Sequence, residues 1–120
     1  MLVIGFISSA NAEAGDIRHE RVHFPKGEIG TTIHDHIKGY QIVDYKLHAR
    51  AGQWMNVGLK TDNLSNYFNI MAPGETEIAF FIGSTEGNQF EGDLPQSGDY
   101  TIRVYLMRNA ARRNEKAHYT

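Results

Sequence analysis

The sequence contains no cysteine, which excludes a disulfide framework, a catalytic thiolate and a zinc–thiolate site. It has no apolar run of the roughly 18 residues that a membrane-spanning helix needs. Glycine-rich phosphate loops, internal repeats and low-complexity tracts are also absent, and no segment carries a helical apolar stripe over three turns. The 120 residues, of which 41% are hydrophobic, therefore suit one soluble globular domain built from strands.

The chain has little net charge, but its positive charge is concentrated near the carboxy terminus. Twelve basic against 14 acidic side chains give −2, which excludes a general attraction to nucleic acid or to an anionic membrane. Residues 100–120 contain five basic side chains and one acidic one, a local charge of about +4 that leaves about −6 elsewhere. This distribution predicts a local acidic partner.

The first twelve residues, MLVIGFISSANA, are typical of the end of a secretory signal. An apolar run from Leu2 to Ile7 precedes Ala10-Asn11-Ala12, which has the small-x-small form that signal peptidase cleaves. We therefore predict a signal-peptide remnant over 1–12 and a single mature β-sandwich domain over 13–120. The alternative is that the same residues form a plain amino-terminal strand.

From residue 40 onward, apolar and polar residues alternate with a period of two, and Gly, Pro, Asn and Asp separate the alternating runs. This pattern predicts half-buried strands joined by turns; Tyr45, Leu47 and Ala49, for example, share one face. We expect strands at 44–50, 54–60, 67–72, 78–82, 88–94 and 100–106, with weaker candidates at 21–24 and 33–40. The predicted fold class is all-β, an antiparallel β-sandwich of about eight short strands.

Three local features follow from turn residues. Ala51-Gly52-Gln53 predicts a hairpin between 44–50 and 54–60. Tyr100, directly after Ser97-Gly98-Asp99, is expected to bond its hydroxyl to nearby backbone, as a tyrosine corner does. Residues 117–120 look like a return strand that ends almost at once, so either this strand is very short or the sequence is truncated.

Several kinds of chemical site find little support in the residues. Ser97 lacks the strand–nucleophile–helix setting of a serine hydrolase, and the carboxylates cluster in polar turns, which does not favour a glycosidase. His34 and His36 would place two imidazoles on one face of a strand, which is half of a metal site with no third ligand indicated. We therefore predict no catalytic residue, no cofactor and no metal.

The basic residues that follow the strand 100–106 do not stabilise the fold through interactions with one another. If 109–112 forms one helical turn, Arg108 and Arg112 stand on the same side at i and i+4, where like charges cost roughly 0.2–0.5 kcal/mol. Guanidinium forks bind carboxylates well, and a charge-assisted hydrogen bond contributes roughly 1.5–3 kcal/mol once water is excluded. The arrangement suits entry into an acidic cleft; the alternative is a solvated hairpin tip whose charge keeps the protein soluble.

Short motifs extend from about Arg21 to Tyr119. They are Phe24 with Lys26-Gly27, Ile37-Lys38-Gly39-Tyr40, Asp44-Tyr45, Ala49 with Gly52-Gln53, Leu94-Pro95, Ser97-Gly98-x-Tyr100, Arg103-Val104 and Arg108-Asn109-x-Ala111-Arg112. In these motifs the sequence resembles the periplasmic inhibitors of g-type (goose-type) lysozyme from Gram-negative bacteria. Gly-Gln and Ser-Gly-x-Tyr signatures also occur in β-sandwich modules of secreted peptidases, whereas the arginine tip is more specific to the inhibitors.

The resemblance implies a periplasmic β-sandwich, not an enzyme, that plugs the active-site cleft of lysozyme with a loop. By position, the lysozyme-binding residues would be Arg108, Arg112, Asn109, Arg113, Ser97, Gly98 and Tyr100. The two arginines Arg108 and Arg112 would enter the cleft and pair with a catalytic carboxylic acid, while the Ser-Gly-x-Tyr residues would shape the neighbouring loop. The sequence departs from the family where Ala110 replaces an expected aspartate, where Arg113 adds a charge, and over 63–92, which match poorly.

Two other interpretations stay open. Trp54, Tyr67 and Tyr105 fall on outer strand faces, so the chain would be a secreted accessory or carbohydrate-binding module if Trp54 or Tyr105 stacks on glycan strands and no second layer covers it. The other open interpretation is a metal-binding domain with its site at His34 and His36. The short carboxy-terminal strand also leaves an open edge, through which two chains could exchange strands and form a homodimer.

Overall fold

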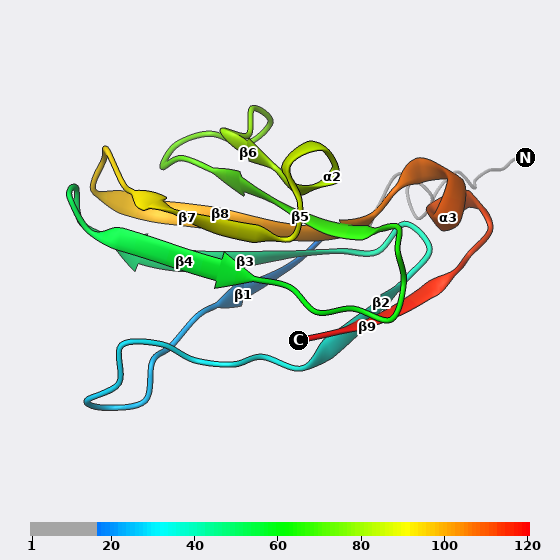
Figure 1. Cartoon of the computed structure of the whole chain (residues 1–120), viewed down its shortest axis with the longest axis horizontal. Helices are drawn as coiled ribbons and strands as arrows, with labels where there is room; N and C mark the ends of the chain where they lie inside the picture. Colours follow the sequence, from blue (N-terminus) through cyan, green and yellow to red (C-terminus); the bar gives the residue numbers. More distant parts are fainter. Residues whose placement is uncertain (1–16) are drawn as a thin grey trace, which may run out of the picture.

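The structure, a computed structural model that describes residues 17–120, consists of strands in two packed layers (Figure 1). The strands are β1 (Ile17–Arg21), β2 (Asp35–Lys38), β3 (Ile42–Ala49), β4 (Trp54–Gly58), β5 (Asn66–Met71), β6 (Phe81–Ile82), β7 (Gln89–Asp93), β8 (Gly98–Leu106) and β9 (Lys116–Tyr119); the short helices are α2 (Gly83–Glu86) and α3 (Arg108–Arg112). One layer is a five-stranded sheet in the order β1-β3-β8-β5-β6. Two two-stranded sheets, β4-β7 and β2-β9, pack against its inner face.

The predicted all-β class is confirmed, although one strand pair is not antiparallel. Within residues 17–120 the chain forms nine strands, and β1 runs parallel to β3 with Ile17 opposite Ile42. The predicted strand at 21–24 is therefore misplaced, because β1 ends at Arg21. Its sequence, IRHER, is almost entirely polar, so apolar alternation gave no signal for this edge strand.

The predicted hairpin between the third and fourth strands is wrong. The turn itself forms, with the Gln53 amide donating to the Arg50 carbonyl over 3.0 Å and Gly52 at φ 90°. It carries the chain from one layer into the other, so that β3 pairs with β8 and β4 pairs with β7. Period-two alternation identifies the buried face of a strand but not the strand with which it pairs.

The core lies between the layers and is rich in aromatic rings. Tyr100 is fully buried, and the Phe81 ring centroid lies 5.2 Å from that of Phe68 and 5.3 Å from that of Phe90. These contacts connect β5 and β6 of the large sheet to β7 of the opposite layer. Offset and edge-on aromatic pairs of this kind add about 0.5–1.5 kcal/mol each beyond the area that they bury.

The return strand predicted near the carboxy terminus is β9, a very short strand of four residues. It pairs with β2 and not with β8, and the opposed residues Ile37 and Ala117 are both buried. The predicted signal remnant over 1–12 lies outside the described residues. In the described part of the chain, no helix has the length and apolar character needed to cross a membrane.

Candidate functional site

The arginine residues lie on α3, a single helical turn that connects β8 to β9 at one end of the molecule (Figure 1). The helical turn that was considered for 109–112 does form, and it starts at Arg108. Ala110 and Ala111 form the buried side of this turn, and the Met107 amide donates to the Ser65 carbonyl over 2.9 Å at its start. The turn is therefore anchored from below, and small side chains are what allow it to sit close to the core.

The end of α3 is fixed by residues in special backbone conformations. Asn114 is left-handed (φ 59°), a conformation that asparagine tolerates, and its amide donates to the Ala111 carbonyl over 2.9 Å. Gly39, also at positive φ (62°), donates its amide to the Glu115 carbonyl over 2.8 Å. A Cβ atom at Gly39 would lie 2.6 Å from the Asn114 Oδ1, so only glycine permits this contact. The contact places Gly39 next to the end of α3, and the half-exposed Tyr40 follows it in the chain.

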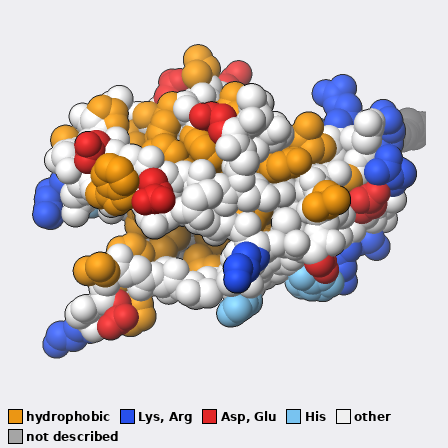
Figure 2. Space-filling model, in the orientation of Figure 1, with side chains coloured by type: hydrophobic (Ala, Val, Ile, Leu, Met, Phe, Trp, Pro, Cys, Tyr) orange, Lys and Arg blue, Asp and Glu red, His pale blue; other side chains and the backbone are white. Residues whose placement is uncertain are grey.

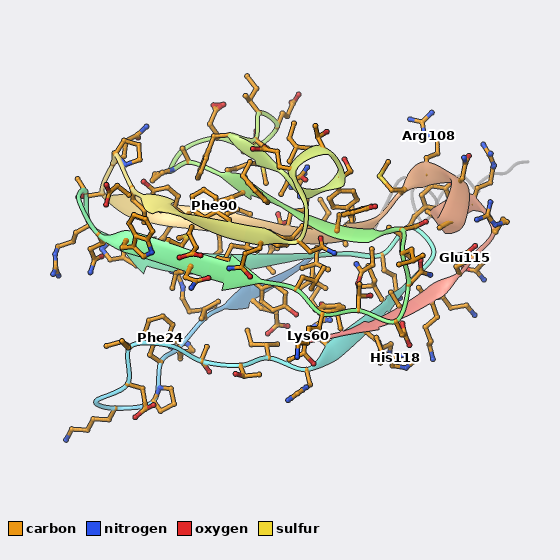
Figure 3. The ribbon with its side chains drawn as sticks, viewed as in Figure 1. Phe24, Lys60, Phe90, Arg108, Glu115 and His118 are labelled. Carbon is orange, nitrogen blue, oxygen red and sulfur yellow. The ribbon has the colours of Figure 1, made fainter. Side chains whose placement is uncertain are left out.

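Four polar side chains of this region are exposed: Arg108, Asn109, Arg112 and Arg113. We call these four residues together with Tyr40 the arginine end. Figure 2 shows Lys and Arg side chains gathered here, and Arg108 projects away from the rest of the protein (Figure 3).

The charges at the arginine end are not equally satisfied. Arg113 forms an ion pair with Glu115 at 2.7 Å, and hydrogen bonds from Asn63 and then Arg113 hold the pKa of Glu115 below its ordinary value. Arg112 donates to the Asn109 Oδ1 over 2.8 Å. Within residues 17–120, neither Arg108 nor Arg112 has a carboxylate partner. Two guanidinium groups are therefore available to an external anion.

Arg103, counted above with the basic residues near the carboxy terminus, has a different role. It lies in β8 and forms two hydrogen bonds with Asp44 of β3, at 2.8 and 2.9 Å. Asp44 is only 2% exposed, and the hydrogen bond to it raises the pKa of Arg103. This bidentate pair holds two neighbouring strands together, so Arg103 does not contribute to the exposed charge.

The Ser-Gly-x-Tyr residues lie at the opposite end of β8, which we call the motif end (Ser97, Gly98 and Tyr100). The Tyr100 hydroxyl donates to the Gln96 carbonyl over 2.7 Å and accepts from the Gln96 amide at 3.2 Å, which confirms the predicted tyrosine corner. The Ser97 Oγ accepts from the Ala51 amide over 2.8 Å. A Cβ atom at Gly98 would lie 2.8 Å from the Pro73 Cβ. These residues therefore hold neighbouring segments of the same chain together.

The structure therefore separates two groups that the sequence interpretation placed together. At about 3.3 Å per residue, the eight steps along β8 put Gly98 about 26 Å from Leu106, the last residue before Met107 and α3. The Ser-Gly-x-Tyr residues do not shape a loop next to the arginines. An unbroken alternation from Tyr100 to Leu106 was the signal in the sequence for this separation. Tyr40, which follows the Gly39 that contacts Asn114, was noted only as part of a motif.

The other candidate residues fall elsewhere. The Tyr105 hydroxyl donates to the Asn69 Oδ1 over 2.9 Å, and Tyr67 lies opposite Tyr105, so the two pack on the sheet surface. Trp54 is 63% exposed. His34 lies 2.8 Å from the Thr120 Oγ1, and residues 17–120 contain no preassembled group of three or more His, Asp, Glu or Cys side chains in metal-binding geometry.

A β-sandwich that, within residues 17–120, displays guanidinium groups without carboxylate partners on an anchored turn has a surface suited to binding an acidic macromolecule. No family model matches the sequence. PliG of Aeromonas hydrophila, a periplasmic lysozyme inhibitor of g-type lysozyme, is similar in crystal structure (TM-score 0.78, 36% identity, covering 88% of this chain and 93% of that one). A mutant of the Escherichia coli PliG is similar at a TM-score of 0.65 and 27% identity, over 87% and 94%.

A curated relative from Escherichia coli (strain K12), "Inhibitor of g-type lysozyme", is 27% identical over 122 residues, which cover 99% of this chain and 88% of the relative. The chain belongs to the family of periplasmic inhibitors of g-type lysozyme.

Proposed function

We propose that this protein is a periplasmic inhibitor of a g-type lysozyme and that it blocks the active-site cleft of the enzyme with its arginine end. The names of its relatives support the target, the compartment and the absence of enzymatic activity. The observation that carries the mode of binding is the pair Arg108 and Arg112, which are exposed on an anchored helical turn without a carboxylate partner among the described residues.

The chemistry of the target makes such a pair effective. Lysozyme-type glycosidases depend on carboxylic acids in a cleft that must admit a glycan strand. A guanidinium group forms two parallel hydrogen bonds with a carboxylate, and these strengthen when water is excluded. Arg108 would therefore neutralise an acidic group and occupy the space of the substrate. Tyr40 would add a flat apolar contact beside it, and Tyr and Arg are both enriched among residues that dominate interfaces.

We assign the motif end a supporting role in this proposal. Ser97, Gly98 and Tyr100 hold backbone groups of the β3–β4 and β7–β8 connections in place, at the far end of β8 from Arg108. Asn109 follows Arg108 and Arg113 follows Arg112, and these two residues complete the surface offered to the enzyme. Contact with lysozyme is thus proposed for the arginine end alone.

The test is inhibition of cell-wall lysis by g-type, c-type and i-type lysozymes. The unaltered protein should inhibit the g-type enzyme selectively, and the double variant Arg108→Ala/Arg112→Ala should lose roughly 30-fold or more of its potency. Arg50→Ala is the matched control, since it removes an exposed arginine from the turn beside Ser97 at the motif end. Full potency of the double variant at unchanged melting temperature would refute the mode of binding, while no inhibition by the unaltered protein would refute the function.

Two further parts of the proposal concern the mature chain. We propose that residues 1–12 are removed and that 13–120 form the mature domain, which the intact mass of the periplasmic protein would test. A homodimer formed by strand exchange stays a prediction, since β9 pairs with β2 of the same chain in this structure. Light scattering of the purified protein would decide between one chain and two.

A carbohydrate-binding module is the second candidate function, and the exposed ring of Trp54 favours it. Trp54 is the only tryptophan, so its fluorescence reports directly on a sugar stacked against it. Saturable quenching by peptidoglycan fragments without lysozyme would support this function. The same titration with no quenching would leave lysozyme inhibition alone.

A further inference from the structure

The outer face of the β2–β9 sheet carries histidines that take no part in the proposed contact with lysozyme. In the antiparallel register His36 of β2 stands directly opposite His118 of β9. Both side chains are exposed, and their ring centroids are 5.7 Å apart. Figure 2 shows His side chains at this surface, and Figure 3 labels His118. Two imidazoles are therefore within reach of one small ligand.

Asp62 fixes the orientation of one of these rings. Its Oδ1 accepts from the His118 amide at 2.8 Å, and its Oδ2 lies 2.9 Å from the His118 Nδ1. An ionised carboxylate can only accept, so in the neutral imidazole the Nδ1 carries the proton and the Nε2 has a free lone pair. A carboxylate behind a histidine is the arrangement that orients histidine ligands in metal sites.

We propose that His36 and His118 bind a divalent transition-metal ion, zinc or copper, through the Nε2 of His118 and a ring nitrogen of His36, with Asp62 as the positioning residue. Imidazole suits both metals. A tetrahedral zinc ion with bonds of about 2.0–2.1 Å holds two nitrogens about 3.3 Å apart, a spacing that rotation of the His36 side chain would reach while Asp62 holds the His118 ring. Because residues 17–120 offer no preassembled set of three ligands, water completes the coordination.

The surroundings explain why this pair, and not the pair noted in the sequence, forms the site. His34 lies just before β2, the strand of His36, and its Nδ1 lies 2.8 Å from the Thr120 Oγ1. The next outward pair along the two strands is Lys38 with Lys116. Asp62 is thus the group that offsets the charge of a bound cation.

Titration of the untagged full chain with zinc or copper ions alone, followed by calorimetry, tests the proposal. We expect one ion per chain, with at least a tenfold loss of affinity in His36→Ala and in His118→Ala. His48→Ala is the matched control, because His48 is also exposed with its Nδ1 3.1 Å from a carboxylate, that of Asp99, but stands opposite Asp99 and not opposite a second imidazole. Unaltered metal affinity in His118→Ala, or a loss of affinity in His48→Ala equal to that in His118→Ala, would refute the proposed site.

Two measurements keep the test decisive if a histidine variant folds poorly. Asp62→Asn retains the side-chain shape and should bind the ion about 10- to 100-fold more weakly. In the unaltered chain, nitrogen-detected NMR of the imidazoles should show a large shift of the His118 Nε2 on zinc binding. A saturating zinc concentration that leaves this signal unchanged would refute the proposal regardless of the variants.

Discussion

The two ends of strand β8 carry the two most distinctive motifs of the sequence, and the structure gives them opposite properties. At the motif end, Tyr100 is fully buried and its hydroxyl bonds twice to Gln96, while Ser97 accepts a hydrogen bond from Ala51. At the arginine end, Arg108 is exposed and, within residues 17–120, has no ion-pair partner. One end uses its polar groups internally, and the other leaves the Arg108 guanidinium exposed.

This difference shows how a motif shared across a family can have a structural cause. Turning a chain at the start of a long strand requires backbone groups to be satisfied, and a buried tyrosine hydroxyl does so for two of them. Nothing in that requirement involves an enzyme target. Like charges at i and i+4 have the opposite character, since Arg108 and Arg112 repel each other and neither has a carboxylate partner within residues 17–120. Energetic cost without internal benefit is what marks a binding surface.

The largest effect is expected from Tyr100→Ala. Removing a fully buried aromatic side chain leaves a cavity and two unpaired backbone groups, so the free energy of unfolding should fall by about 3–5 kcal/mol. Urea unfolding followed by circular dichroism measures this loss. The fraction that remains folded at low temperature should inhibit lysozyme with unchanged potency. A stable variant with lost inhibition would place the motif end in the interface.

The second effect concerns the arginine end and is about 30-fold in potency. Arg108→Ala removes a guanidinium group that we place in the cleft, a truncation that costs about 2 kcal/mol at an interface hot spot. Arg113→Ala is the comparison, because Arg113 already pairs with Glu115 at the exposed surface and should change potency less than about fivefold. Inhibition constants of the two variants decide the point. Equal losses of potency would mean that the binding energy is distributed over the whole arginine end.

A smaller effect is expected from Tyr100→Phe, which removes the hydroxyl and keeps the ring. The lost hydrogen bond to the Gln96 carbonyl should reduce the free energy of unfolding by about 1 kcal/mol. Potency against lysozyme should stay the same. A tenfold weaker inhibition at this small cost in stability would contradict the assignment of a purely structural role.

Much of the fold followed from local sequence patterns. The alternation in 44–50, 67–72 and 100–106 identified β3, β5 and β8 because these strands have one buried and one more polar face. The helical turn at Arg108 and the hydroxyl bond of Tyr100 were also predictable, since both depend on neighbouring residues. Local patterns do not indicate which strands pair with each other. The pairing of β4 with β7 and the parallel pairing of β1 with β3 were therefore missed.

The candidate site was only half predictable for the same reason. The exposed arginines follow from a local excess of charge, which the sequence displays directly. Tyr40 belongs to the site because Gly39 packs against Asn114, a contact between residues far apart in the sequence. The cross-strand pair of His36 and His118 likewise depends on the register of β2 against β9. Side chains that meet only through tertiary contacts carry no signal of one another in one sequence.

The smallest expected effect is a loss of stability in acid at the motif end. Hydrogen bonds from Arg21, at 2.7 Å, and then from His48 lower the pKa of Asp99 to about 2. Above about pH 4 the Asp99 carboxylate is charged in the folded and the unfolded chain, and the ion pair stabilises the fold fully. As the pH falls from about 4 towards 2, the unfolded chain takes up the proton first, so the folded state loses this advantage.

Asp99→Asn isolates that contribution, because other carboxylates such as Asp62 and Glu115 also have lowered pKa values. The variant should be slightly less stable than the unaltered chain at pH 5, and the difference should vanish near pH 2. The Arg21–Asp99 pair is exposed, so 0.5 M salt should shrink the difference as well. A difference that stays constant with pH would mean that Asp99 stabilises the motif end through its shape and not its charge. Inhibition should remain unaffected throughout, since Asp99 adjoins Tyr100 and not the arginines.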